Sequence, residues 1–235
     1  ISDINEIIQN NLKLSLSDKA IKRVEDCRLF LNKKISKSID PIYGINTGFG
    51  SLCNNKVSSD NLSQLQYNLV VSHACGVGEE VPEDIVKIMM ILKVQSLSFG
   101  NSGVQLKTIT RLIELYNNDI LPVIYEQGSL GASGDLAPLA HMSLALLGLG
   151  QANFNSKKTD VKSIYKKLSW EPINLLSKEG LALLNGTQFM SAYGVWSIII
   201  SKRLSYFADL VGTISFEVFD CRGECFSYFG FTVRL

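Results

Sequence analysis

The sequence has little net charge and lacks long hydrophobic runs. Its 235 residues include 23 Lys and Arg against 22 Asp and Glu, a formal net charge of +1, which gives no general attraction to nucleic acid or anionic lipid. The longest apolar stretch near the end, Val195 to Ile200, is far too short to cross a bilayer. The segment from Ile1 to Asn11 has no long apolar core, so it lacks the character of a secretory signal. We therefore expect no nucleic-acid partner and no membrane partner.

Histidine and cysteine are also scarce, which bears on metal binding and location. The chain has two histidines, His73 and His141, and five cysteines. An odd, scattered set of cysteines in a chain of this length indicates reduced thiols and a cytoplasmic location. Cys221 and Cys225 are four residues apart, but no second pair of Cys or His accompanies them. We therefore expect no metal site.

Helix signals, in contrast, are abundant. Hydrophobic residues make up 46% of the chain and charged residues 19%, enough apolar material for a substantial core. Apolar side chains recur at helical spacing, and few segments alternate with period two. The predicted helices begin near residues 17, 59, 82, 104, 136 and 187 and end near residues 31, 76, 92, 116, 147 and 211, and a small hairpin is predicted around residues 152–154. The sequence thus predicts a mainly α fold, a bundle of long helices in a single domain over residues 1–235.

A first glycine-rich segment runs from Tyr43 to Gly50 and includes Gly44 and Gly48. Such a density of glycines between two predicted helices marks a loop with special backbone angles. The segment fits a plain turn. A phosphate cradle fits less well, because no Lys-Ser/Thr pair follows to hold phosphate and metal.

A second segment, from Gly128 to His141, reads Gly-Ser-Leu-Gly-Ala-Ser-Gly-Asp-Leu-Ala-Pro-Leu-Ala-His. Its simplest interpretation is a glycine-rich turn in which Asp135 caps a helix that begins at Leu136. A nucleophile elbow does not fit, because no glycine lies two residues after Ser133 and no strand is predicted before it.

A third segment, from Glu179 to Thr187, predicts a helix that ends at Asn185-Gly186, followed by Thr187 as the cap of the next helix. The three segments, together with Val71-Ser72-His73-Ala74, closely resemble the N-terminal part of the aromatic amino-acid ammonia-lyases. The match runs from Tyr43 to about Asp220, and its second segment is highly specific. The Ser72-His73 pair resembles the histidine ammonia-lyases, since relatives that act on phenylalanine tend to be apolar there.

This resemblance implies a long-helix bundle of the ammonia-lyase (fumarase/aspartase-like) type, a homotetramer, and a carbon–nitrogen lyase that converts L-histidine to trans-urocanate and ammonia. An amine is a poor leaving group and a β-hydrogen is barely acidic. The enzyme therefore needs a strong electrophile, a role usually given to a cofactor. In this family the tripeptide matched by Ala132-Ser133-Gly134 forms that cofactor autocatalytically, as 4-methylidene-imidazol-5-one.

The three residue types suit this cyclisation. The Gly134 amide nitrogen attacks the Ala132 carbonyl, loss of water closes a five-membered ring, and loss of the Ser133 hydroxyl leaves the methylidene. Gly134 has no side chain and Ala132 has a small one, so the two groups can approach closely. Asp135 is a candidate to assist proton removal, a role compatible with capping a helix.

The resemblance also implies roles outside the tripeptide. Tyr43 aligns with the proposed general base, although it also fits an aromatic anchor at a loop boundary. Gly50 belongs to the loop that would fold over the substrate and contact it. His73 would contact the substrate imidazole, or else be structural. Asn185 would hydrogen-bond the new ring or the substrate amine, or else simply end its helix.

Other residues of the second segment are given no part in the chemistry. His141 lies on an apolar helix face and is interpreted as a packed, hydrogen-bonded histidine. Leu130, Leu139 and Met142 are interpreted as core residues.

The sequence also departs from the family pattern. Complete members are considerably longer, and their later helices carry further site residues, so we expect a chain truncated at its C-terminus with little or no activity alone. Phe99 replaces a residue that many relatives have as polar or basic, and the stretch after Asp220 does not match. Three alternatives stay open: a tyrosine or phenylalanine ammonia-lyase, an aminomutase, and a non-catalytic helical fragment.

Overall fold

The structure is a computed structural model, and it describes residues 1–37, 40–48, 55, 57–58, 61–131 and 134–220. It divides into two units, Ile1–Val195 and Trp196–Leu235. The helices are α1 (Ser2–Gln9), α2 (Asp18–Lys37), α3 (Leu62–His73), α4 (Glu83–Ser98), α5 (Leu106–Asn117), α6 (Ala137–Leu144), the 3-10 helix η3 (Ala145–Leu147), α7 (Val161–Leu168), α8 (Glu179–Leu184) and α9 (Gln188–Val218). The prediction of a mainly α fold is confirmed, and the single domain stays a prediction.

Two of the helices begin where the sequence predicts them to. α2 starts after Ser17, whose Oγ accepts a hydrogen bond from the Ala20 N–H at 3.3 Å, as an N-cap does. α4 starts after Pro82 and carries Glu83 and Asp84 in its first turn, where carboxylates favour the positive end of the helix dipole.

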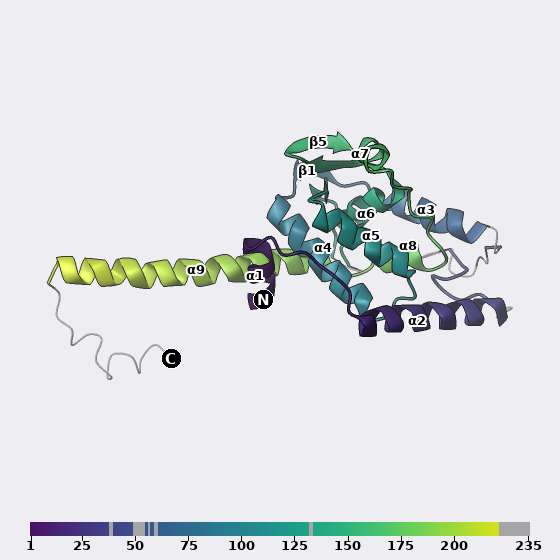
Figure 1. The fold of residues 1–235 in the computed structure, drawn as a ribbon, viewed down its shortest axis with the longest axis horizontal. Helices are drawn as coiled ribbons and strands as arrows, with labels where there is room; N and C mark the ends of the chain where they lie inside the picture. The colour runs from purple at the N-terminus through teal and green to yellow at the C-terminus, as the bar shows by residue number, and fades with distance from the viewer. Residues whose placement is uncertain (38–39, 49–54, 56, 59–60, 132–133, 221–235) are drawn as a thin grey trace. The chain divides into compact units, whose positions relative to one another are not determined.

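The core of the first unit is built around α4, in which nine of sixteen residues are buried. Figure 1 shows α4 beside α5 in this unit. α4 packs against α1, α2 and α5, and α6 packs against α3 and α8. The buried side chains of α4 are Ile85, Val86, Ile88, Met89, Met90, Ile91, Lys93, Val94 and Leu97. A lysine among eight apolar neighbours is the exception in this helix.

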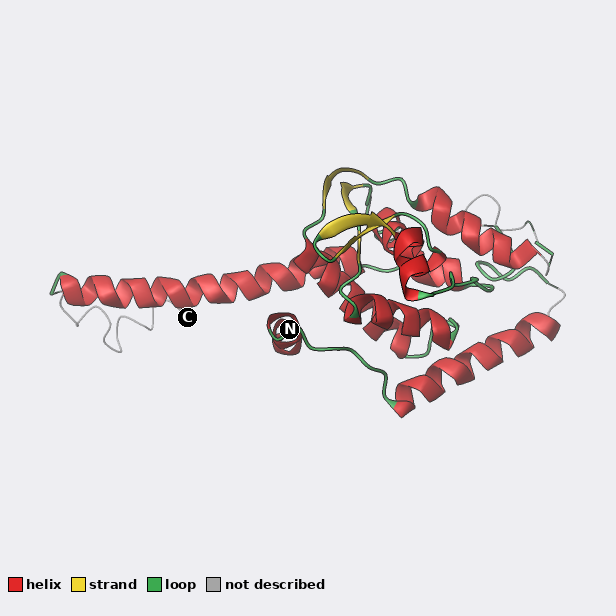
Figure 2. Cartoon of the chain, turned by 45° about the horizontal axis from the view of Figure 1, so that its top comes forward, coloured by secondary structure: helices red, strands yellow, loops and turns green. Residues whose placement is uncertain are grey.

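Two small antiparallel sheets complete the first unit (Figure 2). β1 (Val77–Glu80) pairs with β3 (Tyr125–Gln127). β2 (Leu121–Pro122) pairs with β4 (Gln151–Phe154), which forms a hairpin with β5 (Lys157–Asp160). The predicted hairpin is confirmed, whereas β1 and β3 were not predicted because each is too short to show alternation.

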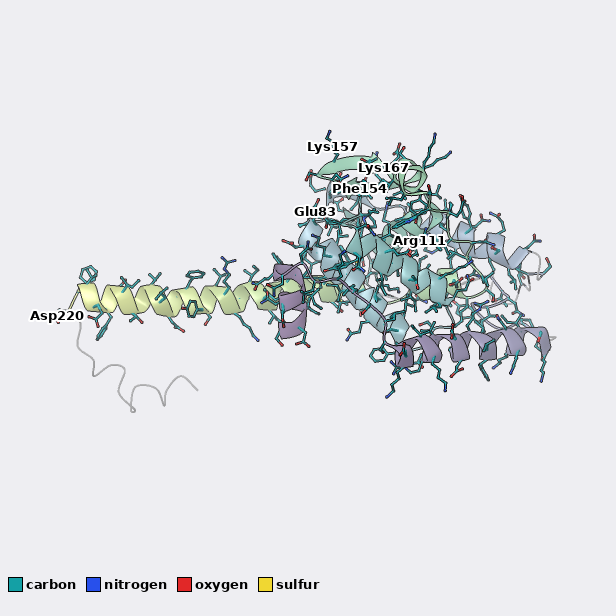
Figure 3. The ribbon with its side chains drawn as sticks, in the orientation of Figure 1. Glu83, Arg111, Phe154, Lys157, Lys167 and Asp220 are labelled. Carbon is teal, nitrogen blue, oxygen red and sulfur yellow. The ribbon has the colours of Figure 1, made fainter. Side chains whose placement is uncertain are left out.

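The helix α7 follows this hairpin and was also not predicted. Arg111 on α5, labelled in Figure 3, holds it in place. Its guanidinium lies 5.1 Å from the Tyr165 ring centre and 4.6 Å from that of Trp170. The Tyr165 hydroxyl donates to the Ala145 carbonyl at 2.6 Å, which ties α7 to η3. On the other side, the Lys167 ammonium lies 5.3 Å from the Phe154 ring of the hairpin.

A buried carboxylate joins α8 to the start of α5. Glu179 is 0% exposed, and its oxygens accept hydrogen bonds from the Gln105 N–H at 2.9 Å, the Thr108 hydroxyl at 2.6 Å and the Leu176 N–H at 2.7 Å. A buried carboxylate is stable when its oxygens are bonded in this way. Glu179 thereby fixes α8, the helix of the third glycine-rich segment.

The second unit contains the greater part of α9, and its described side chains are mostly exposed. Tyr206 and Phe207 pack edge to face, with ring centres 5.9 Å apart. Among the helices in the described part of the chain, none has the length and apolarity to cross a membrane.

Candidate functional site

The structure brings the second and third glycine-rich segments together at Gly134 and Gly186. Gly134 has φ +106, and a Cβ on it would lie 2.7 Å from the Gly186 oxygen and 3.0 Å from the Gly186 nitrogen. The next residue bonds to the same glycine, since the Asp135 N–H donates to the Gly186 carbonyl at 2.8 Å. No side chain fits at position 134, which therefore requires glycine. Ala132 and Ser133 lie outside the described residues.

Asp135 caps α9 rather than the helix that follows it in sequence. Its side chain is 1% exposed, and Oδ2 accepts the Phe189 N–H at 2.7 Å and the Met190 N–H at 3.4 Å. Burial raises the pKa of Asp135, and the N–H bonds and Lys93 act against this rise. The expected cap of the helix that follows Asp135 is thus wrong: the start of α6 has no side-chain cap hydrogen bond, and the carboxylate bonds the free N–H groups of α9 instead.

The backbone turns sharply after Asp135. Leu136 has φ +38, a left-handed value that costs energy for a residue with a side chain, and α6 begins at the next residue with Pro138 in its first turn. The prediction of Leu139 and Met142 as core residues is confirmed, since both are 0% exposed. For Leu130 it is wrong: this side chain is 91% exposed because it lies in the loop before the helix.

Asn185 follows the last residue of α8 and has an exposed side chain. Its backbone N–H donates to the Leu181 carbonyl at 3.0 Å. Its carbonyl accepts a hydrogen bond from the Lys93 ammonium at 2.9 Å. The side-chain amide is left facing outward, where it could bond to a ligand.

Lys93 was not among the candidates from sequence. It is 1% exposed on α4, and burial lowers its pKa to about 7, with Asp135 acting in the opposite direction. The signal in the sequence was a single cation within an apolar helical stripe, and that pattern does not say what the cation contacts.

The first glycine-rich segment forms a turn that presents Tyr43. This side chain is 57% exposed, whereas Asn46 and Thr47 of the same turn are buried. Asn46 Oδ1 accepts the Ile42 N–H at 2.5 Å, and the Thr47 hydroxyl donates to the Gly48 carbonyl at 2.9 Å. These bonds fix the turn on both sides of Tyr43. Gly50, the predicted substrate contact, lies outside the described residues.

His73 is the last residue of α3 and is half-buried. Its Nδ1 lies 2.9 Å from the Leu69 carbonyl and 3.2 Å from the Ser72 hydroxyl. In the tautomer that bonds the carbonyl, Nδ1 donates, because a carbonyl can only accept, and Nε2 is an acceptor. This tautomer suits a partner that has an N–H or O–H group.

His141 positions the chain that follows His73. Its Nε2 accepts the Gly76 N–H at 2.9 Å, and its ring packs edge to face on Tyr125 with centres 5.2 Å apart. The structure thus places it as the packed, hydrogen-bonded histidine that the sequence indicated. Burial lowers its pKa, and a proton on Nε2 would also remove the acceptor for Gly76.

We expect this bond to make the stability of the chain depend on pH. The folded pKa lies below the unfolded value of about 6.5, so the contribution of His141 is fully present above that value and is lost as pH falls through the folded pKa. Denaturant unfolding at about pH 8 and about pH 5 should show a smaller difference for His141→Gln, which keeps an acceptor but does not titrate, than for the wild type. Equal differences in the two proteins would contradict this assignment.

The hydrogen bonds that join Asp135 to Gly186 and to α9 connect backbone and carboxylate groups of those segments. His73 bonds within its own helix, through Nδ1 and the Leu69 carbonyl. The roles predicted for Tyr43, His73, Gly134 and Asn185 therefore stay predictions. As for metals, the described residues contain no group of three His, Cys, Asp or Glu side chains that could hold an ion.

Comparison with known proteins identifies relatives of both the sequence and the fold. Histidine ammonia-lyase of Vibrio cholerae is 43% identical over 217 residues, which are 92% of this chain and 42% of that protein. The crystal structure of histidine ammonia-lyase from Trypanosoma cruzi matches with TM-score 0.86 and 35% identity over 94% of this chain and 43% of that one. Phenylalanine aminomutase of Pantoea agglomerans matches with TM-score 0.81 and 35% identity over 86% and 39% of the two chains.

The helical fold is thus that of the ammonia-lyases and aminomutases. The family described as aromatic amino acid lyase matches residues 1–235, and the chain belongs to this family. The resemblance seen in the glycine-rich segments is confirmed. The chain spans less than half the length of the curated relatives it matches.

Proposed function

We propose that this chain is the N-terminal part of a histidine ammonia-lyase, which releases ammonia from L-histidine to give trans-urocanate. In this proposal Ala132, Ser133 and Gly134 form the 4-methylidene-imidazol-5-one group. The observation that carries the proposal is the packing of Gly134 on Gly186 beside Asn185. It supports the proposal because it joins two of the segments on which the family resemblance rests.

The described residues fit the formation of this group. Gly134 packs so closely on Gly186 that a Cβ at this position would clash. Because glycine has no side chain, its amide nitrogen is unobstructed. Asp135 is tied to Gly186 through its backbone and to α9 through its carboxylate. The segment on the C-terminal side of the tripeptide is therefore held in one conformation, and such preorganisation favours an intramolecular cyclisation.

When formed, the group supplies the electrophile that an ammonia-lyase requires. The side chains of this chain bind and orient the substrate. In this proposal the amide of Asn185, which is exposed, hydrogen-bonds the substrate amine. His73, with its proton on Nδ1, offers Nε2 as an acceptor for an imidazole N–H, and Tyr43 is the base that takes the β-proton.

Intact-mass measurement tests the formation of the group. The wild-type chain should be lighter than its sequence mass by two water molecules, whereas Ser133→Ala should have the full mass because the leaving hydroxyl is gone. We expect the variant to unfold at nearly the wild-type denaturant concentration, since the change removes one hydroxyl. A wild-type chain of full sequence mass would favour the non-catalytic alternative.

Product analysis of the complete enzyme tests the choice of substrate. The identity to the aminomutase equals that to the Trypanosoma cruzi ammonia-lyase, at 35%, so both the amino acid and the product must be measured. We expect urocanate from L-histidine and little product from L-tyrosine or L-phenylalanine. A β-amino acid product would identify an aminomutase. In this proposal the family's tetramer completes the site, and we expect little or no turnover from this chain alone.

A further inference from the structure

The buried lysine of α4 has no part in the function proposed so far. Its ammonium group can donate three hydrogen bonds, and two acceptors lie on the same short segment: the Asn185 carbonyl at 2.9 Å and Gln188 Oε1 at 3.5 Å. Removing an ammonium group from water is costly unless charge and hydrogen bonds compensate. An apolar side chain would fill this position at a lower cost in free energy, so a cation here indicates a further role.

The two acceptors of Lys93 bracket Gly186. Asn185 precedes this glycine, and the Gln188 side chain lies so close to it that a Cβ on Gly186 would meet the Gln188 amide. Gly186 in turn contacts Gly134 and accepts the Asp135 N–H. A chain of direct contacts thus runs from the ammonium group, through the turn, to the glycine of the tripeptide.

Among the described residues, the Asp135 carboxylate is the charged group that raises the pKa of Lys93, against the effect of burial. This carboxylate is itself buried and caps α9, the helix to which Gln188 belongs. The cation and the anion therefore reach the same turn from two sides, Lys93 from α4 and Asp135 from the loop before α6. Removing the cation leaves the turn without its donor and the carboxylate without its countercharge.

We propose that Lys93 is a positioning residue, which holds the Asn185–Gly186 turn against Gly134 and so sets the geometry in which the tripeptide cyclises. The inference rests on the proposed function, because the cyclisation itself is part of that proposal. In this proposal Lys93 is not itself a reacting group and acts through the backbone of Asn185.

The test compares the wild type with Lys93→Met, which keeps the length of the side chain and removes its charge. Lys87→Met is the matched control, because Lys87 lies on the same helix and pairs with Asp119 at 2.9 Å near the surface. The first measurement follows the backbone amide signals of Gly186 and Asp135 by NMR between about pH 5 and about pH 9. Since burial lowers the pKa of Lys93 to about 7, both signals should titrate near that pH in the wild type and in Lys87→Met, and not in Lys93→Met.

The second measurement follows the loss of two waters by intact mass after refolding. We expect Lys93→Met to lose the two waters about tenfold more slowly than the wild type, or slower still, which is the effect of removing one hydrogen bond to a charged group. Lys87→Met should lose them at the wild-type rate. Lys93→Arg should recover part of the rate because it retains the charge. If Lys93 served packing alone, Lys93→Met should lose the two waters at the wild-type rate.

The two proposals fail in distinguishable ways. If the wild-type chain never loses water, the proposed function is rejected. The Gly186 amide signal then decides the assignment of Lys93: if Lys93 holds the turn through the Asn185 carbonyl, this signal should shift in Lys93→Met and not in Lys87→Met. If Lys93→Met loses water at the wild-type rate and the Gly186 signal titrates unchanged, the assignment of Lys93 is overturned and the proposed function stands.

Discussion

Gly134→Ala should lower the free energy of unfolding by about 3 kcal/mol or more and should abolish the loss of two waters. The added Cβ would lie 2.7 Å from the Gly186 oxygen and 3.0 Å from the Gly186 nitrogen. Both are backbone atoms, and the oxygen already accepts the Asp135 N–H at 2.8 Å. The contact can be relieved only if that bond lengthens, which would move the segments that meet at the tripeptide apart.

Gly131→Ala separates this close contact from backbone strain. Gly131 also has a positive φ, +78, but a Cβ there would meet no atom of the described residues within 4 Å. Its replacement should cost about 1–2 kcal/mol from the left-handed backbone alone. Urea unfolding gives the two stabilities, and intact mass gives the extent of cyclisation. Equal losses of stability in the two variants would mean that Gly134 does not pack on Gly186 as the structure shows.

Much of the helical architecture could be predicted because it is encoded locally. α2 and α4 carry their own start signals in Ser17 and Pro82, and their apolar residues recur at helical spacing. α7 was not predicted because its packing depends on a residue far away in sequence. Arg111 of α5 supplies the cation that stacks on Tyr165 and Trp170, and no local pattern announces such a partner.

The same distinction separates what was predicted at the site from what was not. The glycine-rich segments could be selected as candidates because closely spaced glycines mark a backbone that must turn sharply or approach another segment. Their meeting at Gly134 and Gly186 could not be predicted, since it joins segments that are about fifty residues apart. The partners of Asp135 and Lys93 were missed for the same reason. A carboxylate before a helix predicts a local cap, and only the fold shows that the N–H groups it bonds belong to α9.

Asp135→Ala should be the most destabilising change at this position. It would remove the acceptor of the Phe189 and Met190 N–H groups at the start of α9. A buried donor left without an acceptor costs about 1–3 kcal/mol for each group, so the alanine variant should lose roughly 2–6 kcal/mol. Asp84→Ala is the control, because Asp84 lies exposed in the first turn of α4 and its loss should cost about 0.3–1 kcal/mol.

Asp135→Asn distinguishes the acceptor atom of Asp135 from its charge. Burial raises the pKa of Asp135, so the fold compensates the ionised carboxylate incompletely, and the acceptor should matter more to stability than the charge. We expect the asparagine variant to lose about 1–2 kcal/mol, less than the alanine variant, in urea unfolding at neutral pH. If it is as unstable as Asp135→Ala, the charge rather than the hydrogen bond holds α9. If it folds well but keeps its full sequence mass, the carboxylate takes part in the proton transfers of cyclisation, because an amide can accept the same N–H groups but cannot act as a base.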